Sequence, residues 1–136
     1  MGKGVATNMA SELYVASILW RLGYKVTLTL GHTKEIDLFA EKNGKIITID
    51  VKSVRTGPFL LQKKPEILNK KNHFFVFVRY GRHFSDISKN PVCYVVPATE
   101  LSKVIKDAAG MERIWEGKLS ELEKNFKERW DLLEKV

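Results

Sequence analysis

The sequence is poor in cysteine and has no long apolar run. A single cysteine, Cys93, excludes an intramolecular disulfide and a cysteine-based zinc site. Cys93 lies in an apolar run, so we expect it to be a small buried hydrophobic residue, as is usual in a reducing cytosol. No stretch of about 18 consecutive apolar residues exists, which argues against a membrane span. The N-terminus lacks the apolar core of a signal peptide, so secretion is not supported either. We therefore expect a cytoplasmic protein with no membrane role.

Acidic residues are fewer than basic ones, and linker-like segments are lacking. There are 16 Asp and Glu against 23 Lys and Arg, which gives a formal net charge of +7 and favours a polyanionic partner such as DNA. Neither internal repeats nor a Ser/Gly/Pro-rich stretch divides the chain. A length of 136 residues suits one domain with an ordinary core, so we expect a single domain over residues 1–136.

An Asn-Gly pair separates two short segments with the residue pattern of strands. Asn43-Gly44 predicts a two-residue hairpin turn. The resulting register puts apolar residues on one face, and on the other face it puts Asp37 directly opposite Asp50. Lys52 projects from the same face as Asp50, because side chains two apart on a strand point the same way. Two opposed carboxylates repel unless a cation or a shared proton lies between them, so this pair predicts a metal site.

The N-terminal segment predicts a helix from about Thr7 or Asn8 to Leu22, with Gly23 as its C-terminal stop. On a helical wheel Glu12 falls near the centre of an apolar arc, so we expect it to face the core. The arc consists of Val5, Met9, Val15, Ala16, Leu19 and Trp20. A buried carboxylate needs a cation, a hydrogen-bond donor or a proton. Either a functional site or a structural arginine or amide could satisfy Glu12.

The remaining elements predict an α/β fold with a mixed sheet of about five strands flanked by helices. The predicted strands span 24–30, 35–41, 45–52, 74–78 and 92–96, with a loop from 57, a short helix around 66–70, and helices over 99–108 and 118–134. An apolar stripe on the last helix comprises Leu119, Leu122, Phe126, Trp130 and Leu133. This stripe could dock on the sheet or form a dimer interface, and the sequence does not separate the two.

The acids and the lysine stand in an order that resembles the PD-(D/E)xK nuclease superfamily, which includes restriction endonucleases and archaeal-type Holliday junction resolvases. The matching positions are Glu12, Ile36-Asp37 and Asp50-Val51-Lys52. The resemblance covers roughly the first 80 residues, where the motif and the order of elements agree. It departs from the pattern at Ile36, where the superfamily is named for a proline, and at Asp50, where glutamate is commoner. It implies a restriction endonuclease-like fold, with an N-terminal helix before a three-stranded meander.

The resemblance also implies a Mg²⁺-dependent endonuclease that hydrolyses DNA phosphodiester bonds, with Mn²⁺ as a substitute. Asp37, Asp50 and the Val51 carbonyl would supply hard oxygen ligands, and Glu12 an outer or second-metal contact. Lys52 would contact the scissile phosphate and neutralise charge in the transition state. We expect structured or branched DNA as the substrate and a homodimer as the active form. The alternatives are a restriction, repair or mobile-element nuclease, and a non-catalytic DNA-binding module of the same fold.

Basic residues gather near the predicted site. Lys63, Lys64, Lys70 and Lys71 flank the short proline-containing segment, and Arg55 follows the strand of Lys52. They predict a surface that tracks DNA phosphates, although a solvated lysine face explains any one of them equally well.

Ordinary surface roles are open for several of these groups. The two opposed aspartates could be solvated at a sheet end, with Glu35 and Lys52 forming a surface ion pair. His32 could act as a base, but it resembles an ordinary loop histidine more closely. Gln62 could be an accessory site residue or a surface residue.

Overall fold

The computed structural model describes residues 2–29, 36–62, 70–104, 106–108, 111–114 and 116–135. The elements, in chain order, are α1 (Lys3–Arg21), β1 (Lys25–Leu28), β2 (Leu38–Lys42), β3 (Lys45–Val54), β4 (Phe59–Gln62), β5 (His73–Arg79), β6 (Val92–Pro97), the 3₁₀ helix η1 (Ala98–Lys103), β7 (Lys106–Ala108), β8 (Met111–Ile114), α3 (Glu116–Asn125) and the 3₁₀ helix η2 (Trp130–Glu134). No helix in these described ranges is both long and apolar enough to cross a membrane.

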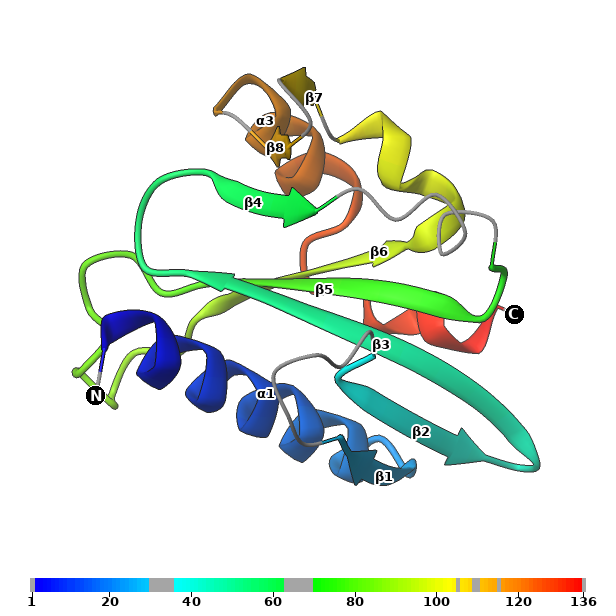
Figure 1. Ribbon diagram of the computed structural model, residues 1–136. Coiled ribbons are helices and arrows are strands. Elements are labelled where there is room, and N and C mark those ends of the chain that lie inside the picture. The colour runs from blue at the N-terminus through cyan, green and yellow to red at the C-terminus, as the bar shows by residue number, and fades with distance from the viewer. Residues whose placement is uncertain are drawn as a thin grey trace.

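Five strands form the central sheet in the order β1-β2-β3-β5-β6 (Figure 1). β3 and β5 run parallel, whereas the other neighbouring pairs are antiparallel. The crossover between β3 and β5 carries the chain through β4, which belongs to a second sheet of order β4-β8-β7. The predicted mixed sheet of five strands after an N-terminal helix is confirmed.

The predicted hairpin between β2 and β3 is also confirmed. Lys42 pairs with Lys45, and the ladder continues regularly to Leu38 opposite Ile49. Both turn residues have positive φ, 54° at Asn43 and 77° at Gly44. Two consecutive left-handed residues define the turn that matches the twist of paired strands, and asparagine followed by glycine adopts it at the lowest cost. Local turn chemistry therefore sets the register that brings Asp37 to the level of Asp50.

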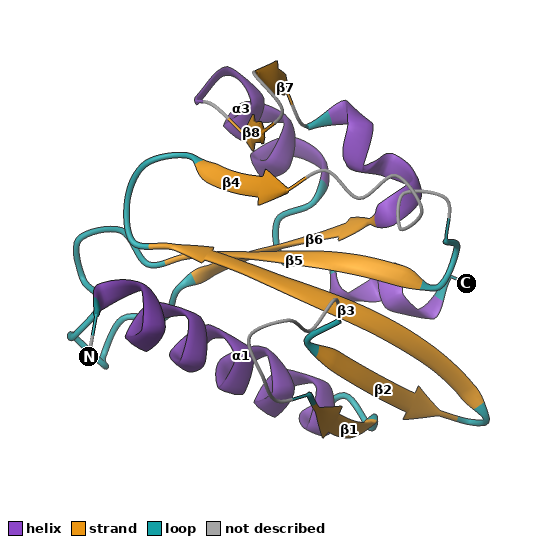
Figure 2. Cartoon of the chain, in the orientation of Figure 1, coloured by secondary structure: helices purple, strands orange, loops and turns teal. Residues whose placement is uncertain are grey.

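The central sheet is covered on both faces (Figure 2). α1 and η2 lie against one face, and the small sheet, η1 and α3 lie against the other (Figure 1). β5 shows the consequence most clearly, because Phe74 and Val76 belong to the core under α1 while Phe75 and Phe77 belong to the core on the opposite face. All six residues 73–78 are buried, as expected for a continuous apolar strand.

α1 differs from the prediction in its start and in the face that it buries. It begins at Lys3 rather than at Thr7 or Asn8, and it ends as expected, with Gly23 in the left-handed region at φ 96°. Three members of the predicted apolar arc, Val5, Met9 and Trp20, are more than half exposed, and Glu12 is half-buried. The buried side of the helix instead carries Thr7, Ser11, Val15, Ala16 and Leu19.

The C-terminal third differs more. The predicted helix over 99–108 is a 3₁₀ helix that ends at Lys103 and is followed by β7. The predicted helix over 118–134 is interrupted after Asn125, and its last part is η2. Leu122, Phe126 and Leu133 of its stripe are buried within the chain.

The prediction of a loop from residue 57 is wrong at Phe59–Gln62, which form β4. It is four residues long and pairs with β8, whose residues come about fifty positions later in the sequence. The short helix predicted around 66–70 falls, except for Lys70, outside the described residues.

Candidate active site

Asp37 lies where the ladder between β2 and β3 ends. Its backbone N–H donates to the Ile49 carbonyl at 3.1 Å, and its own carbonyl accepts from the Thr29 N–H at 3.0 Å. Its carboxylate Oδ2 accepts a hydrogen bond from the Val51 N–H at 2.7 Å. The side chain thus takes the place of the backbone carbonyl that a longer β2 would have offered to Val51. The result is a carboxylate, 9% exposed, held against the edge of β3.

Asp50 and Lys52 lie on the next part of the same strand. Asp50 is 6% exposed, and its Oδ1 lies 3.6 Å from Lys52 Nζ. Asp50 pairs with Phe75 of β5, so both acid and lysine project from the face opposite α1. About a third of the Lys52 side chain is exposed, which leaves its ammonium accessible to a ligand.

Val51 links the two aspartates. The N–H and the carbonyl of one strand residue point to the same side, so the Val51 carbonyl faces the edge on which the Asp37 carboxylate lies. Asp37, Asp50, Val51 and Lys52 therefore meet at one place, where β3 extends beyond β2.

Glu12 approaches this place from the α1 side of the sheet. In the preceding helical turn, Asn8 Oδ1 accepts from Ser53 Oγ at 2.9 Å, and Thr7 Oγ1 accepts from Arg55 Nε at 3.0 Å. Four residues of a helix advance about 6 Å, nearly as far as two residues of a strand, so Glu12 comes level with Val51. It is half-buried there, across β3 from the Asp50 side chain.

The donor set fits a hard divalent cation in chemistry. Two carboxylates on adjacent strands and a backbone carbonyl are oxygen ligands of the kind that Mg²⁺ binds while it keeps several waters. Within the described ranges, no three side chains of His, Cys, Asp or Glu come close enough together to hold a metal ion. The protein side of such a site therefore consists of Asp37, Asp50 and the Val51 carbonyl, and Glu12 approaches β3 from the α1 side.

Of the predicted phosphate-binding residues, Arg55 has the best-defined geometry. Its guanidinium carbon lies 3.9 Å from the centroid of the Phe84 ring, and its Nε donates to Thr7. Both contacts fix the planar group and direct it along the end of β3. Lys70 and Lys71 are exposed just before β5, while Lys63 and Lys64 lie outside the described residues.

His73 is a buried residue near the site that the sequence did not reveal. Its Nδ1 lies 2.7 Å from Thr48 Oγ1, and its Nε2 has no hydrogen-bond partner in the part of the chain that the structure describes. Burial and, to a smaller extent, the charge of Lys70 lower the pKa of His73 to about 4, although Asp37 opposes both effects. The run of aromatic and β-branched residues after it indicated a strand and gave no sign of a polar contact. His32, Glu35 and the side chain of Gln62 are not described, so their predicted roles stay predictions.

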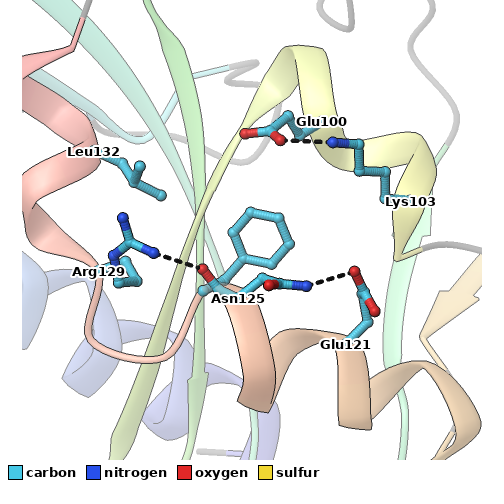
Figure 3. Close-up of a pocket in the computed structure, with 7 residues that line it drawn as sticks. Glu100, Lys103, Glu121, Asn125, Arg129 and Leu132 are labelled. Atoms are coloured by element: carbon cyan, nitrogen blue, oxygen red, sulfur yellow. Dashed lines mark hydrogen bonds and ion pairs between the residues drawn. The ribbon is translucent and has the colours of Figure 1, made fainter.

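A hollow of about 290 Å³ lies elsewhere, between η1, α3 and η2 (Figure 3). Its polar groups bind one another: Lys103 pairs with Glu100 at 2.8 Å, and Asn125 donates to Glu121 at 2.6 Å. Arg129 donates to the Asn125 carbonyl at 3.3 Å. None of the predicted site residues lines this hollow.

The order of elements and the sheet topology define a restriction endonuclease-like fold, as predicted from the sequence. The structure is similar to that of a bacterial homing endonuclease, I-Ssp6803I, with a TM-score of 0.59 and 18% identity over 99% of this chain and 94% of that one. It is also similar to Hjc, a Holliday junction resolvase from Archaeoglobus fulgidus, with a TM-score of 0.55 and 12% identity over 83% and 87% of the two chains. No protein-family profile and no curated protein sequence matches this chain.

Proposed function

We propose that this protein is a metal-dependent endodeoxyribonuclease with its site at the edge of β3. The observation that carries the proposal is the Asp37 carboxylate bound to the Val51 N–H, between Asp50 and Lys52 in sequence. A structural role alone does not require two acids, a lysine and a fixed carbonyl together where β3 extends beyond β2. The fold and the net charge of +7 support DNA as the substrate.

Each residue has a distinct part in the proposed reaction. Asp37 and Asp50, with the Val51 carbonyl, would hold Mg²⁺, which when bound supplies positive charge at the scissile phosphate. The hydrogen bond from Val51 fixes the orientation of Asp37 before substrate arrives. Lys52 would place its ammonium against the non-bridging phosphate oxygens and stabilise the charge that develops there as water attacks in line. The half-buried Glu12 would act as an outer ligand from the helix side.

Structured or branched DNA, cut by a homodimer, is the substrate that we favour. The structural similarity to a Holliday junction resolvase supports this choice. A mobile-element endonuclease is the second candidate, supported by the similarity to I-Ssp6803I over nearly the whole chain.

The test is cleavage of labelled duplex and four-way-junction DNA with Mg²⁺, Mn²⁺ or EDTA. Asp37→Asn, Asp50→Asn and Lys52→Ala should each reduce cleavage by at least about a hundredfold, since each removes a charge at the reacting phosphate. Asp131→Asn is the matched control, because Asp131 is an exposed acid in η2 that pairs with Arg129. Thermal melting of every variant verifies that it is folded.

The outcomes separate an enzyme from a binding module. Metal-dependent cleavage that all three site variants lose and that Asp131→Asn retains supports the nuclease. DNA binding that persists in Asp50→Asn, with no cleavage by the wild type under any metal condition, means that the fold serves as a non-catalytic DNA-binding module. If the wild type cleaves DNA, a preference for cleaving the four-way junction over the duplex supports the branched-DNA candidate, and the opposite preference supports the mobile-element candidate.

A further inference from the structure

The loop between β5 and β6, residues 80–91, presents an apolar side chain to solvent at its tip. Ile87 is 96% exposed. The other large exposed hydrophobic side chains among the described residues are between 38% and 56% exposed, so each of them still covers part of a neighbour. Ile87 covers nothing and contributes no burial to the folded state.

The backbone holds Ile87 in a defined position. The Lys89 N–H donates to the Asp86 carbonyl at 3.1 Å, which closes a turn with Ile87 at its first central position. Within the same turn, Asp86 Oδ1 accepts from the Ser88 N–H at 3.1 Å and from the Ser88 hydroxyl at 2.5 Å. Further back, the Asp86 N–H donates to the His83 carbonyl at 3.0 Å. Ile87 thus projects from two consecutive hydrogen-bonded turns.

The same loop is fastened to the strand that carries the proposed site. Tyr80 and Phe84 pack edge to face, with ring centroids 4.8 Å apart. The Arg55 guanidinium lies over the Phe84 ring. Arg55 follows Lys52 by three residues. In Figure 1 the loop lies at the end of β3 and β5, beside the N-terminus of α1. Arg55 bonds Thr7 on the α1 side of β3, whereas Lys52 projects to the opposite face, so DNA in contact with both would pass the end of β3 at which the loop lies.

The charges around Ile87 suit DNA. Arg82 and Lys89 are exposed in the loop, and His83 is a further exposed polar group. The one acid of the loop, Asp86, uses its carboxylate to accept both hydrogen bonds from Ser88. Cationic side chains around an apolar tip are the combination with which proteins enter a DNA groove and part a base step.

We propose that Ile87 is an apolar wedge that inserts between stacked bases of the DNA bound at the proposed active site. This inference rests on the proposed function and deepens it by naming the substrate class. The wedge favours DNA in which stacking is already interrupted, such as a gap, a branch point or a flexible pyrimidine–purine step, because less unstacking energy is needed there.

The experiment uses the full chain in EDTA, so that DNA is bound but not cut. 2-Aminopurine is placed at successive positions of an intact duplex and of a duplex with a one-nucleotide gap, and its fluorescence reports unstacking. The variants are Ile87→Ala, Ile87→Phe and the matched control Ile46→Ala. Ile46 is about half exposed and lies beside the hairpin turn, at the far end of the sheet from the loop.

We expect wild type to raise the fluorescence at one defined position and Ile87→Ala to abolish that rise. Ile87→Ala should also bind gapped DNA about tenfold more weakly, while Ile87→Phe and Ile46→Ala keep both properties. Two results would overturn the wedge. One is a fluorescence rise that is the same in Ile87→Ala as in wild type, and the other is tight binding by wild type with no fluorescence rise at any position. Failure of the proposed nuclease function can be distinguished from failure of the wedge. In that case Ile87-dependent unstacking would still be seen in EDTA, but no divalent metal would support cleavage.

Discussion

Protonation of His73 should destabilise this protein as the pH falls from about 6.5 to about 4. The unfolded chain takes up a proton at this imidazole near pH 6.5, whereas the folded protein does so only near pH 4. Between these values the unfolded state binds more protons, so stability falls as the pH falls. At about 1.4 kcal/mol for each pKa unit, the folded state should lose about 3 kcal/mol between pH 6.5 and pH 4. The loss is large because burial disfavours the charged ring.

The assay is urea unfolding at closely spaced pH values from 7.5 to about 4.5, followed by near-ultraviolet circular dichroism. His73→Phe removes the titrating group and keeps a ring of similar size next to Phe75. Its free energy of unfolding should be nearly flat between pH 6.5 and 5, where wild type declines. His83→Gln is the control, since His83 is exposed.

Carboxylates affect the stability of the protein in a lower pH range than His73 does. Hydrogen bonds and cations lower the pKa of Glu123, Asp131 and Glu134, so the stability that these groups contribute is lost only as the pH falls through and below their ordinary values of 4.5 and 3.8. An equal slope in wild type and His73→Phe between pH 6.5 and 5 would refute the assignment to His73.

Three further substitutions test the fold and the phosphate contacts. Gly44→Val should cost about 1–3 kcal/mol in urea unfolding, because φ is 77° there and β-branched residues are strained in that region; an unchanged midpoint would contradict the turn. Phe77→Ala should cost about 3–5 kcal/mol because the ring is fully buried, whereas Phe39→Ala should cost far less; equal losses would contradict the core boundary. Arg55→Lys should weaken DNA binding several-fold with little change in the salt dependence of the affinity, because the charge remains and the stacked planar group is lost. Undiminished binding would contradict a role of the stacked guanidinium in DNA binding.

Local chemistry explains what the sequence predicted well. Asn43-Gly44 determined the turn, the turn determined the register, and the register brought Asp37 to the level of Asp50 without any tertiary information. The direct hydrogen bond between Asp37 and the Val51 N–H was not predictable, since it depends on where the ladder of β2 ends. The residues of the candidate site could therefore be placed together from the sequence, but the orientation of the Asp37 carboxylate could not.

The predicted buried face of α1 is wrong because serine and threonine count as polar on a hydropathy scale, although they can be buried in a helix. Ser11 is fully buried, since its Oγ donates to the Thr7 carbonyl at 2.7 Å and lies 3.2 Å from Tyr80 Oη. With its polar atom satisfied inside the helix, it packs like alanine. The predicted arc instead places the larger apolar residues Met9 and Trp20 in the core, and both are more than half exposed.

Long-range pairing explains the error at the C-terminus. Residues after Phe126 leave the helix to bond the edge of β6, with Glu128 at φ 51°. The Glu128 N–H donates to the Cys93 carbonyl at 2.8 Å, and the Cys93 N–H donates to the Glu128 carboxylate at 2.8 Å. A helical stripe in the sequence carries no information about such a distant strand.

The division of the core into two layers has a consequence for synthesis of the chain. The strands that carry the proposed site are complete once Val54 has been made, and α1 can then cover their first face. Phe75 and Phe77 of the second face are covered by Leu122 and Phe126, which emerge from the ribosome much later. We therefore expect a nascent chain that stalls between β6 and α3 to expose an aromatic surface and to be prone to aggregation until α3 has been made.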